Sequence, residues 1–479
     1  MVNQLFHQPY DPAYLEQLVQ ESSNLGQTIS LPVHTPYAFN LLVGFPKLPL
    51  NISTPSTPFV CKPHRDVASA PLRLVRIDAH WRNLLANQSH VISQRSPLFS
   101  FALLTAVVET ILAAPALAPF STFSDVTVFT PGANWTDPGV LYARTVELPG
   151  DVLLATWENY SPQLPLVYFP IFKSTDGGES WKHISNITDQ VNGWGLRYQP
   201  FLYLMTEKVG KYPAGTILAT GLSIPADLSE TQIDVYASLD HGYTWEYVST
   251  VANGDAAFPD NGVPAIWEPF LLTYKGQVVL YYSDQRDPLY GQKLVHTVSS
   301  DLHTWEDLVD DVHYSTYTAR PGMTAITQLP NHKYIMTYEY GGGPTINNTS
   351  TYLFPIYYRI SSSPLTFLST PGIPLITNNG IQPTGSPYIT WTPIGGTNGT
   401  LIVSSGGRTE IFVNRALGAE EEWKTVGTSE KTSYTRHLRV LESNRNHLLI
   451  MGGGILPPTT TNRVSVSVLD ITKGIAAES

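Results

Sequence analysis

The sequence has very little cysteine and few charged residues for its length. Cys61 is the only cysteine among 479 residues, which excludes a disulfide framework within the chain and a cysteine-based metal site. Charged residues make up 14% of the chain, and the formal net charge is −11. Nucleic-acid phosphates repel a surface of that sign, so the composition argues against nucleic acid as a partner.

Several common catalytic signatures are also missing. The chain has no G-x-S-x-G, no H-E-x-x-H and no phosphate-binding loop that ends in Gly-Lys-Ser/Thr. Its 13 histidines show no metal-ligand spacing. After about residue 119, apolar residues do not recur at the spacing of an amphipathic helix over any length. We therefore expect an enzyme or binding protein that uses no cofactor and no metal.

Turn-forming residues and one repeated motif are what the chain has instead. There are 38 prolines, 35 glycines and 26 tyrosines, a balance that suits an all-β protein rich in turns. Residues 174–181 and 238–245 both read S-x-D-x-G-x-x-W, and residues 299–305 form a shorter copy without the glycine. In such a motif the Asp accepts backbone hydrogen bonds, the Gly permits a left-handed turn and the Trp packs between sheets. These residues are predicted to be structural and remote from any chemistry.

The closing aromatic of the motif recurs with a period of about 60 residues, which fits four-stranded propeller blades with long loops. It is found at Trp181, Trp245, Trp305, Phe367 and Trp423. After Trp423, residues 433–441, 447–451 and 464–471 supply three more strands, and residues 125–129 supply the missing fourth. We predict an all-β six-bladed β-propeller whose ring is closed when the N-terminal strand pairs with the last blade. The motif resembles the Asp-box of sialidase-like propellers.

The segment before the propeller has a different character. Residues 95–118 have a basic start, an apolar core and an Ala-x-Ala ending, which is typical of a secretory signal peptide, although a short buried strand or helix is the alternative. We expect a secreted, extracellular protein with a propeller over 119–479. Residues 1–94 do not show the repeat period of the propeller. Our hypothesis is that they come from a wrong start codon or a retained untranslated segment. The alternatives are a disordered extension or a pro-segment. Sequons at Asn134, Asn186, Asn347 and Asn398 are predicted glycan sites on loops.

Acidic residues beside aromatic ones mark the predicted central funnel. Glu158, Glu268 and Glu339 each follow an aromatic residue at the end of a strand-like segment, and Asp284 ends another. A sugar site needs carboxylates for proton transfer or attack and rings to stack on the sugar. The alternative is that these acids are solvated or paired with arginines. The innermost strands are expected to bring further residues to the funnel: Arg144, Arg197, Tyr198, Gln199, Arg320, Tyr434 and Arg436.

From about residue 123 to 471 the chain resembles glycoside hydrolase family 93, the fungal exo-α-1,5-L-arabinanases. The resemblance rests on eight segments that together span the propeller: 141–144, 155–161, 195–201, 267–272, 281–287, 320–323, 338–341 and 463–468. It implies a six-bladed propeller and a retaining enzyme that releases arabinobiose from the non-reducing end of linear α-1,5-L-arabinan.

The resemblance also implies site residues and a partner. The catalytic glutamates are Glu268, assigned here as general acid/base, and Glu339, assigned as nucleophile. The substrate-binding set is Arg144, Glu158, Arg197, Tyr198, Asp284, Arg320, Tyr338 and Tyr434. The expected partner is arabinan or an arabino-oligosaccharide, with no nucleic acid and no membrane, and the protein is expected to be a monomer.

Two other functions compete with this one. A sialidase would hold the substrate carboxylate with three arginines, for which Arg144, Arg320 and Arg436 are the candidates, and would use a Tyr nucleophile assisted by a Glu. The Arg-Ile-Pro motif that usually opens sialidases is absent. A non-catalytic carbohydrate-binding propeller is the second competitor, and it has no reason to direct several acids into one funnel.

Overall fold

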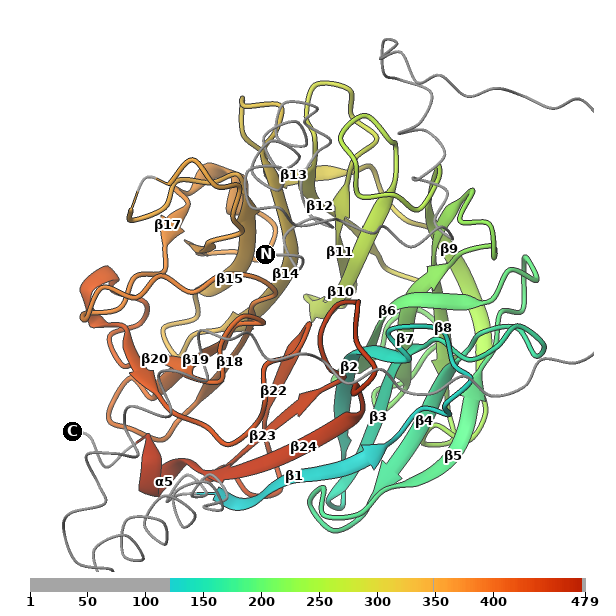
Figure 1. Ribbon diagram of the computed structural model, residues 1–479, viewed down its shortest axis with the longest axis horizontal. Coiled ribbons are helices and arrows are strands. Elements are labelled where there is room, and N and C mark those ends of the chain that lie inside the picture. The colour runs from blue at the N-terminus through green and yellow to red at the C-terminus, as the bar shows by residue number, and fades with distance from the viewer. Residues whose placement is uncertain (1–120, 348, 476–479) are drawn as a thin grey trace, which may run out of the picture. The chain divides into compact units, whose positions relative to one another are not determined.

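The computed structural model describes residues 121–347 and 349–475. The predicted prefix 1–94, which includes Cys61, and the signal-like segment 95–118 lie outside the described residues. Within the described part, six four-stranded antiparallel sheets form a six-bladed β-propeller, as predicted (Figure 1).

The first strand of each blade lies nearest the propeller axis, where it contacts the first strands of the neighbouring blades. These innermost strands are β2 (Val140–Leu148), β6 (Leu196–Leu204), β10 (Ile266–Tyr274), β14 (Arg320–Gln328), β18 (Tyr388–Thr392) and β22 (Arg436–Val440). The second strands are β3 (Val152–Asn159), β7 (Ile217–Ser223), β11 (Gln277–Asp284), β15 (Tyr334–Gly341), β19 (Thr400–Ser404) and β23 (His447–Gly452).

The outer two strands of each blade complete the sheets. The third strands are β4 (Phe169–Ser174), β8 (Thr231–Ser238), β12 (Lys293–Ser299), β16 (Ile356–Ser361), β20 (Ile411–Asn414) and β24 (Val464–Asp470). The outermost strands are β5 (Lys182–Ile187), β9 (Glu246–Gly254), β13 (Val309–Val312), β17 (Ile373–Pro374), β21 (Lys424–Val426) and β1 (Ser121–Phe129). The described helices are short: η2 (Phe367–Ser369), η3 (Glu420–Glu422) and α5 (Ile471–Gly474). No helix among the described residues is long and apolar enough to cross a membrane.

The ring closes as the sequence predicted. Strand β1 is the outermost strand of the last blade, and it pairs antiparallel with β24 in the order β1-β24-β23-β22. Figure 1 shows β1, from the start of the described chain, lying along β24 from its end. Joining the two ends of the chain in one sheet holds the first and last blades together and leaves no gap in the ring.

The repeated motif forms the expected turns and fastens each blade to the preceding one. Asp240 Oδ1 accepts the backbone N–H of Thr244 at 2.9 Å, and Trp245 Nε1 donates to Gly242 O at 3.2 Å and to Ser185 Oγ of the preceding blade at 3.3 Å. The matching backbone bonds in the other two copies run from Ser180 N to Asp176 Oδ1 (2.9 Å) and from Thr304 N to Asp301 Oδ1 (2.7 Å). Phe367 and Trp423 are fully buried at the corresponding positions. The motif therefore organises the outer rim of the propeller, away from its axis.

Candidate active site

Four of the innermost strands carry a β-bulge near their first residues. The residue at the bulge has a left-handed backbone, with φ of 52° at Tyr142, 56° at Gln199, 64° at Glu268 and 58° at Met323, and the strand register shifts at the same places. Ser386, just before β18, has φ of 48°. Left-handed non-glycine residues are uncommon, and at a bulge they turn the backbone N–H out of the sheet ladder.

The N–H groups freed in this way bind side chains of the preceding blade. Four such bonds run from Gln199 N to Glu158 Oε1 (3.0 Å), from Glu268 N to Gln199 Oε1 (2.8 Å), from Met323 N to Glu268 Oε2 (2.6 Å) and from Ser386 N to Glu339 Oε2 (2.7 Å). Each of the three glutamates is thus held in place by the backbone of the next blade. The bulges convert strand ends into a ring of donors that positions acids around the axis.

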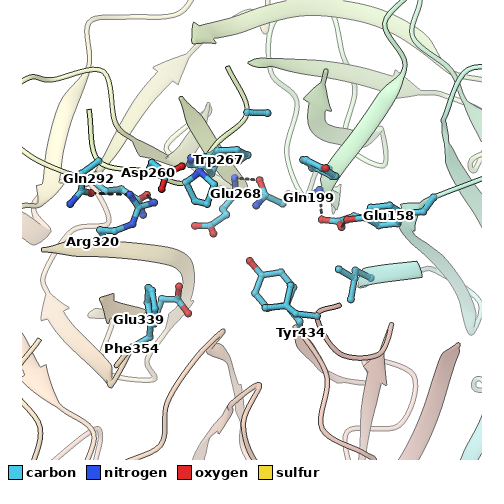
Figure 2. Close-up of a pocket in the computed structure, with 17 residues that line it drawn as sticks. Glu158, Gln199, Asp260, Trp267, Glu268, Gln292, Arg320, Glu339, Phe354 and Tyr434 are labelled. Carbon is cyan, nitrogen blue, oxygen red and sulfur yellow. Dashed lines mark hydrogen bonds between the residues drawn. The ribbon is translucent and has the colours of Figure 1, made fainter. Parts of the chain in front are cut away.

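The acids surround one pocket of about 270 Å³ at this end of the axis (Figure 2). Figure 2 shows the carboxyl groups of Glu268 and Glu339 and the hydroxyl of Tyr434 directed toward the same space. The remaining lining residues are Leu141, Glu158, Tyr160, Tyr198, Gln199, Ala257, Pro259, Asp260, Asn261, Trp267, Gln292, Arg320, Phe354 and Leu456. Carboxyl groups enclosed by aromatic rings are the arrangement expected of a sugar site.

Glu268 is buried and well supplied with hydrogen-bond donors. Its Oε2 accepts the hydroxyl of Ser283 at 2.7 Å as well as the backbone N–H of Met323 at 2.6 Å. Burial raises the pKa of Glu268, while these two hydrogen bonds and the charge of Arg320 lower it. Because both bonds fall on Oε2, Oε1 is left to face a substrate.

Glu339 has fewer partners that favour its charged form. Its Oε2 accepts only the backbone N–H of Ser386, at 2.7 Å, among the described hydrogen bonds. Burial and the neighbouring charge of Glu268 raise the pKa of Glu339 to about 8, against the opposing effects of that bond and of Arg320. Glu268 thus has two hydrogen bonds that favour its anion, and Glu339 has one.

Glu158 is the third acid of the pocket, buried like Glu268, and both of its oxygens have a partner. Oε1 accepts the N–H of Gln199, and Oε2 accepts the hydroxyl of Tyr160 at 2.8 Å. Burial raises the pKa of Glu158 to about 7 despite these bonds. No basic side chain within the described residues forms an ion pair with it, so it remains a hydrogen-bonding group of the pocket wall.

Arg320 provides the positive charge of the pocket. Its guanidinium donates to three amide oxygens, those of Asn261 (3.0 Å), Gln285 (3.1 Å) and Gln292 (2.8 Å). Amide oxygens orient the guanidinium without neutralising it, and none of the ion pairs among the described residues includes Arg320. Its charge therefore acts on Glu268 and Glu339, whose pKa values it lowers.

Six of the ten predicted site residues line the pocket: Glu158, Tyr198, Glu268, Arg320, Glu339 and Tyr434. The other four do not. Asp284 and Tyr338 each lie one residue away from a side chain of the site, Ser283 and Glu339, and successive side chains of a strand point to opposite faces. Asp284 forms an ion pair with Arg286 at 2.8 Å, and the hydroxyl of Tyr338 hydrogen-bonds that of Tyr314 at 2.7 Å.

The two remaining arginines lie outside the pocket lining as well. The guanidinium of Arg144 stacks 4.0 Å from the ring centroid of Tyr142 and bonds Thr435 Oγ1 and Ala143 O. Arg197, next to the lining residue Tyr198, donates to Ile224 O at 3.4 Å.

The three arginines that a sialidase would need do not meet at the pocket. Arg320 lines it, but Arg144 stacks on Tyr142 and Arg436 is fully buried elsewhere. Both terminal nitrogens of Arg436 donate to backbone carbonyls, including those of Arg408 and Thr409 at 2.9 and 2.8 Å. The described site therefore has no cluster of three arginines for a substrate carboxylate.

Sequence reasoning missed part of the pocket wall. Asp260 and Asn261 come from the loop between β9 and β10, Gln292 precedes β12, and Phe354 precedes β16. The alternation of side chains along a strand does not extend into loops, so the sequence contained no indication of where these residues would lie. Gln199 was among the inner-strand candidates but not in the expected substrate-binding set, and its hydrogen bonds to two acids give it a place in the site.

Comparison with solved structures gives close relatives over the whole propeller. An α-L-arabinofuranosidase from Fusarium graminearum, in complex with an iminosugar inhibitor, is 53% identical with a TM-score of 0.73, covering 74% of this chain and 99% of that one. The family 93 α-L-arabinofuranosidase of the same fungus with arabinobiose gives the same values. An α-L-arabinanase from Penicillium chrysogenum with arabinobiose is 51% identical with a TM-score of 0.71, covering 74% and 100%.

The chain belongs to glycoside hydrolase family 93. The resemblance drawn from the sequence segments is confirmed, and the protein is a glycoside hydrolase. No model of a known protein family matches the chain, and no curated protein does. In this family 93 hydrolase, the pocket with the buried Glu158 and Glu268 and the half-buried Glu339 is the candidate active site.

Proposed function

We propose that this hydrolase releases arabinobiose from the non-reducing end of linear α-1,5-L-arabinan with retention of configuration. The observation that carries the proposal is one pocket in which Glu268 and Glu339 face each other, in a chain 51–53% identical to enzymes whose structures hold arabinobiose. Retention requires carboxyl groups about 5–5.5 Å apart, with one acting as nucleophile and the other as acid and base. An exo cut needs one end of the pocket to be blocked, and the lining residues that come from loops, among them Asp260, Phe354 and Leu456, are the candidates for this.

We assign the roles of the two acids in the opposite sense to the sequence-based assignment. The nucleophile must be ionised at rest, and Glu268 has two hydrogen bonds that favour its anion. The general acid must hold a proton, and Glu339 has one such bond and a pKa raised to about 8. Glu268 is therefore the proposed nucleophile and Glu339 the proposed general acid/base.

The mechanism follows from these protonation states. Glu268 Oε1 attacks the anomeric carbon while Glu339 transfers its proton to the departing glycosidic oxygen, which forms a glycosyl ester on Glu268 and frees the shortened arabinan. Glu339, now ionised, takes a proton from water as the water attacks the same carbon, and Glu268 leaves as carboxylate. Arg320 limits the rise in the pKa of Glu268 that burial causes, which keeps the nucleophile charged.

Incubation with linear 1,5-arabinan, with the products separated by size, tests the proposed function. Arabinobiose as the initial product, absent in Glu268→Ala and Glu339→Ala, is the expected result. A ladder of longer oligosaccharides would contradict the exo cut, and monomeric arabinose would contradict the product length. Cleavage of a sialoside in place of arabinan would move the function to the competing enzyme class, and binding without cleavage would indicate a lectin-like propeller.

The pH dependence of kcat/KM is expected to have a basic limb near pH 8. Glu339 must be protonated to act as the acid, and its pKa is raised to about 8, so activity falls as the pH rises through that value. The measurement is kcat/KM for an aryl arabinobioside over about pH 4–10. With a leaving group that needs no protonation, Glu339→Ala should lose this limb. A limb near the ordinary glutamate value of about 4.3 would contradict the assignment.

We also propose that the protein is secreted and acts as a monomer on arabinan. The asparagines of all four sequons, Asn134, Asn186, Asn347 and Asn398, are exposed, as glycan acceptors in a secreted protein must be. Endoglycosidase treatment of protein secreted from a fungal host would lower its apparent mass if these sites carry glycans.

A further inference from the structure

Gln199 links two of the three acids of the pocket. It lies at the bulge of β6, is 7% exposed and lines the pocket. Its backbone N–H donates to Glu158 Oε1 at 3.0 Å, and its side-chain Oε1 accepts the backbone N–H of Glu268 at 2.8 Å. Figure 2 shows Gln199 between Glu158 and Glu268, with both bonds drawn.

The bond to Glu268 fixes the orientation of the Gln199 amide. Because Oε1 accepts an N–H that has no other acceptor, the opposite atom of the amide must be Nε2, which carries two donors. None of the described hydrogen bonds uses Nε2. Nε2 is not one of the fully buried, unpartnered side-chain atoms of the described residues, and Gln199 lines the pocket, so this group is a donor that a ligand in the pocket can reach.

Glu158 supplies the complementary acceptor beside it. Each of its carboxylate oxygens accepts one hydrogen bond, from Gln199 N and from the hydroxyl of Tyr160, and each oxygen has a further lone pair. A donor amide and an acceptor carboxylate that line the same pocket match a hydroxyl group, which accepts one hydrogen bond and donates another.

We propose that Gln199 and Glu158 together hold the 2-hydroxyl of the sugar whose anomeric carbon faces Glu268, which makes Gln199 a specificity-determining residue. The inference rests on the proposed function, which places an arabinofuranosyl residue there. The 2-hydroxyl is carried by the carbon next to the anomeric one, and Gln199 is bonded to the backbone of Glu268 itself. Hydrogen bonds to this hydroxyl strengthen in the transition state of glycosidases, so the pair favours sugars that carry it.

The test compares an aryl α-1,5-L-arabinobioside with an analogue that lacks the 2-hydroxyl on the residue attached to the aryl group. We expect the wild-type protein to lose about 10²-fold in kcat/KM on the deoxy analogue. Gln199→Glu keeps the oxygen that accepts the Glu268 N–H but removes the donor, and we expect its loss on the analogue to shrink to about 10-fold. Glu158→Gln, which replaces the acceptor on the other side, should shrink it similarly.

Gln292→Glu is the matched control, because Gln292 lines the Arg320 side of the pocket. It should leave the ratio between the two substrates at the wild-type value, whatever it does to the rate. A wild-type protein that cleaves both substrates equally, or a ratio unchanged in Gln199→Glu, would overturn the inference while the proposed function stands. A wild-type protein that cleaves neither the arabinobioside nor arabinan would overturn the proposed function itself.

Discussion

Alanine variants of Glu268 and Glu339, the two proposed catalytic glutamates, are expected to form glycosyl azides of opposite configuration when azide is added. In Glu339→Ala the nucleophile Glu268 still forms the glycosyl ester, and azide then attacks from the face that water would use, which gives the retained α-azide. In Glu268→Ala azide occupies the place of the missing carboxylate and gives the inverted β-azide. The products separate by chromatography, and NMR assigns their configuration.

The rates should separate the two variants as well. Loss of a nucleophile is expected to lower kcat on the order of 10⁶-fold. Loss of the general acid should cost about 10²–10⁴-fold, and less with a leaving group that departs unprotonated. The opposite pattern of azides would return the roles to the sequence-based assignment, with Glu268 as acid. No azide adduct from either variant would argue against a covalent intermediate and hence against retention.

Gly322→Ala should impair the site without unfolding the protein. Gly322 lies on the innermost strand β14, directly opposite Glu339 in the β14–β15 ladder. A Cβ at this position would lie 2.9 Å from Gln292 Nε2 and 3.1 Å from Glu268 Oε2, so the Gln292 amide must move and the Glu268 carboxyl must shift by a few tenths of an ångström. Ser283 and Met323 hold that carboxyl in place. Because displacing a catalytic group by about 1 Å costs about 10²-fold in rate, this smaller shift is expected to cost about 10-fold.

The measurement is kcat/KM alongside thermal unfolding. Overpacking a buried site destabilises a protein by about 1–3 kcal/mol, which leaves a propeller of this size folded. Gly427→Ala is the matched control, because a Cβ there meets nothing within 4 Å, and its activity should equal that of the wild type. Full activity in Gly322→Ala would show that Glu268 tolerates displacement and that the close approach is not required.

The architecture was predictable because short sequence motifs that recur along the chain specify the turns of the blades. Asp240 and its counterparts accept hydrogen bonds from residues three or four positions downstream, so the turn is specified by a short stretch of sequence. The closing aromatic recurs at the length of a four-stranded blade, and the count of strands after Trp423 left one to be supplied by the N-terminal end. Strand β1 supplies it.

The lining of the pocket was only partly predictable, and the reason is geometric. A bulge moves one residue of an innermost strand into the left-handed region, so alternation before the bulge does not predict which side chain faces the axis after it. Arg144 and Arg197 were expected in the funnel from strand position and from the family resemblance, but Arg144 stacks on Tyr142 and Arg197 bonds Ile224 O, and neither lines the pocket. Loop residues such as Asp260 follow no repeating pattern from which the direction of their side chains could be predicted.

The sequence by itself determined the family, the blade count, the closure of the ring and the two glutamates that face each other, because motif, period and family segments are all properties of consecutive residues. Only the tertiary structure showed the different hydrogen-bonding of the two carboxyls, on which the proposed roles rest. The pKa of Glu268 or Glu339 depends on burial and on donors from other blades, and Met323 and Ser386 lie 55 and 47 residues away from the acids they bind. Folding alone brings these groups within hydrogen-bonding distance, and their number on each carboxylate sets its charge.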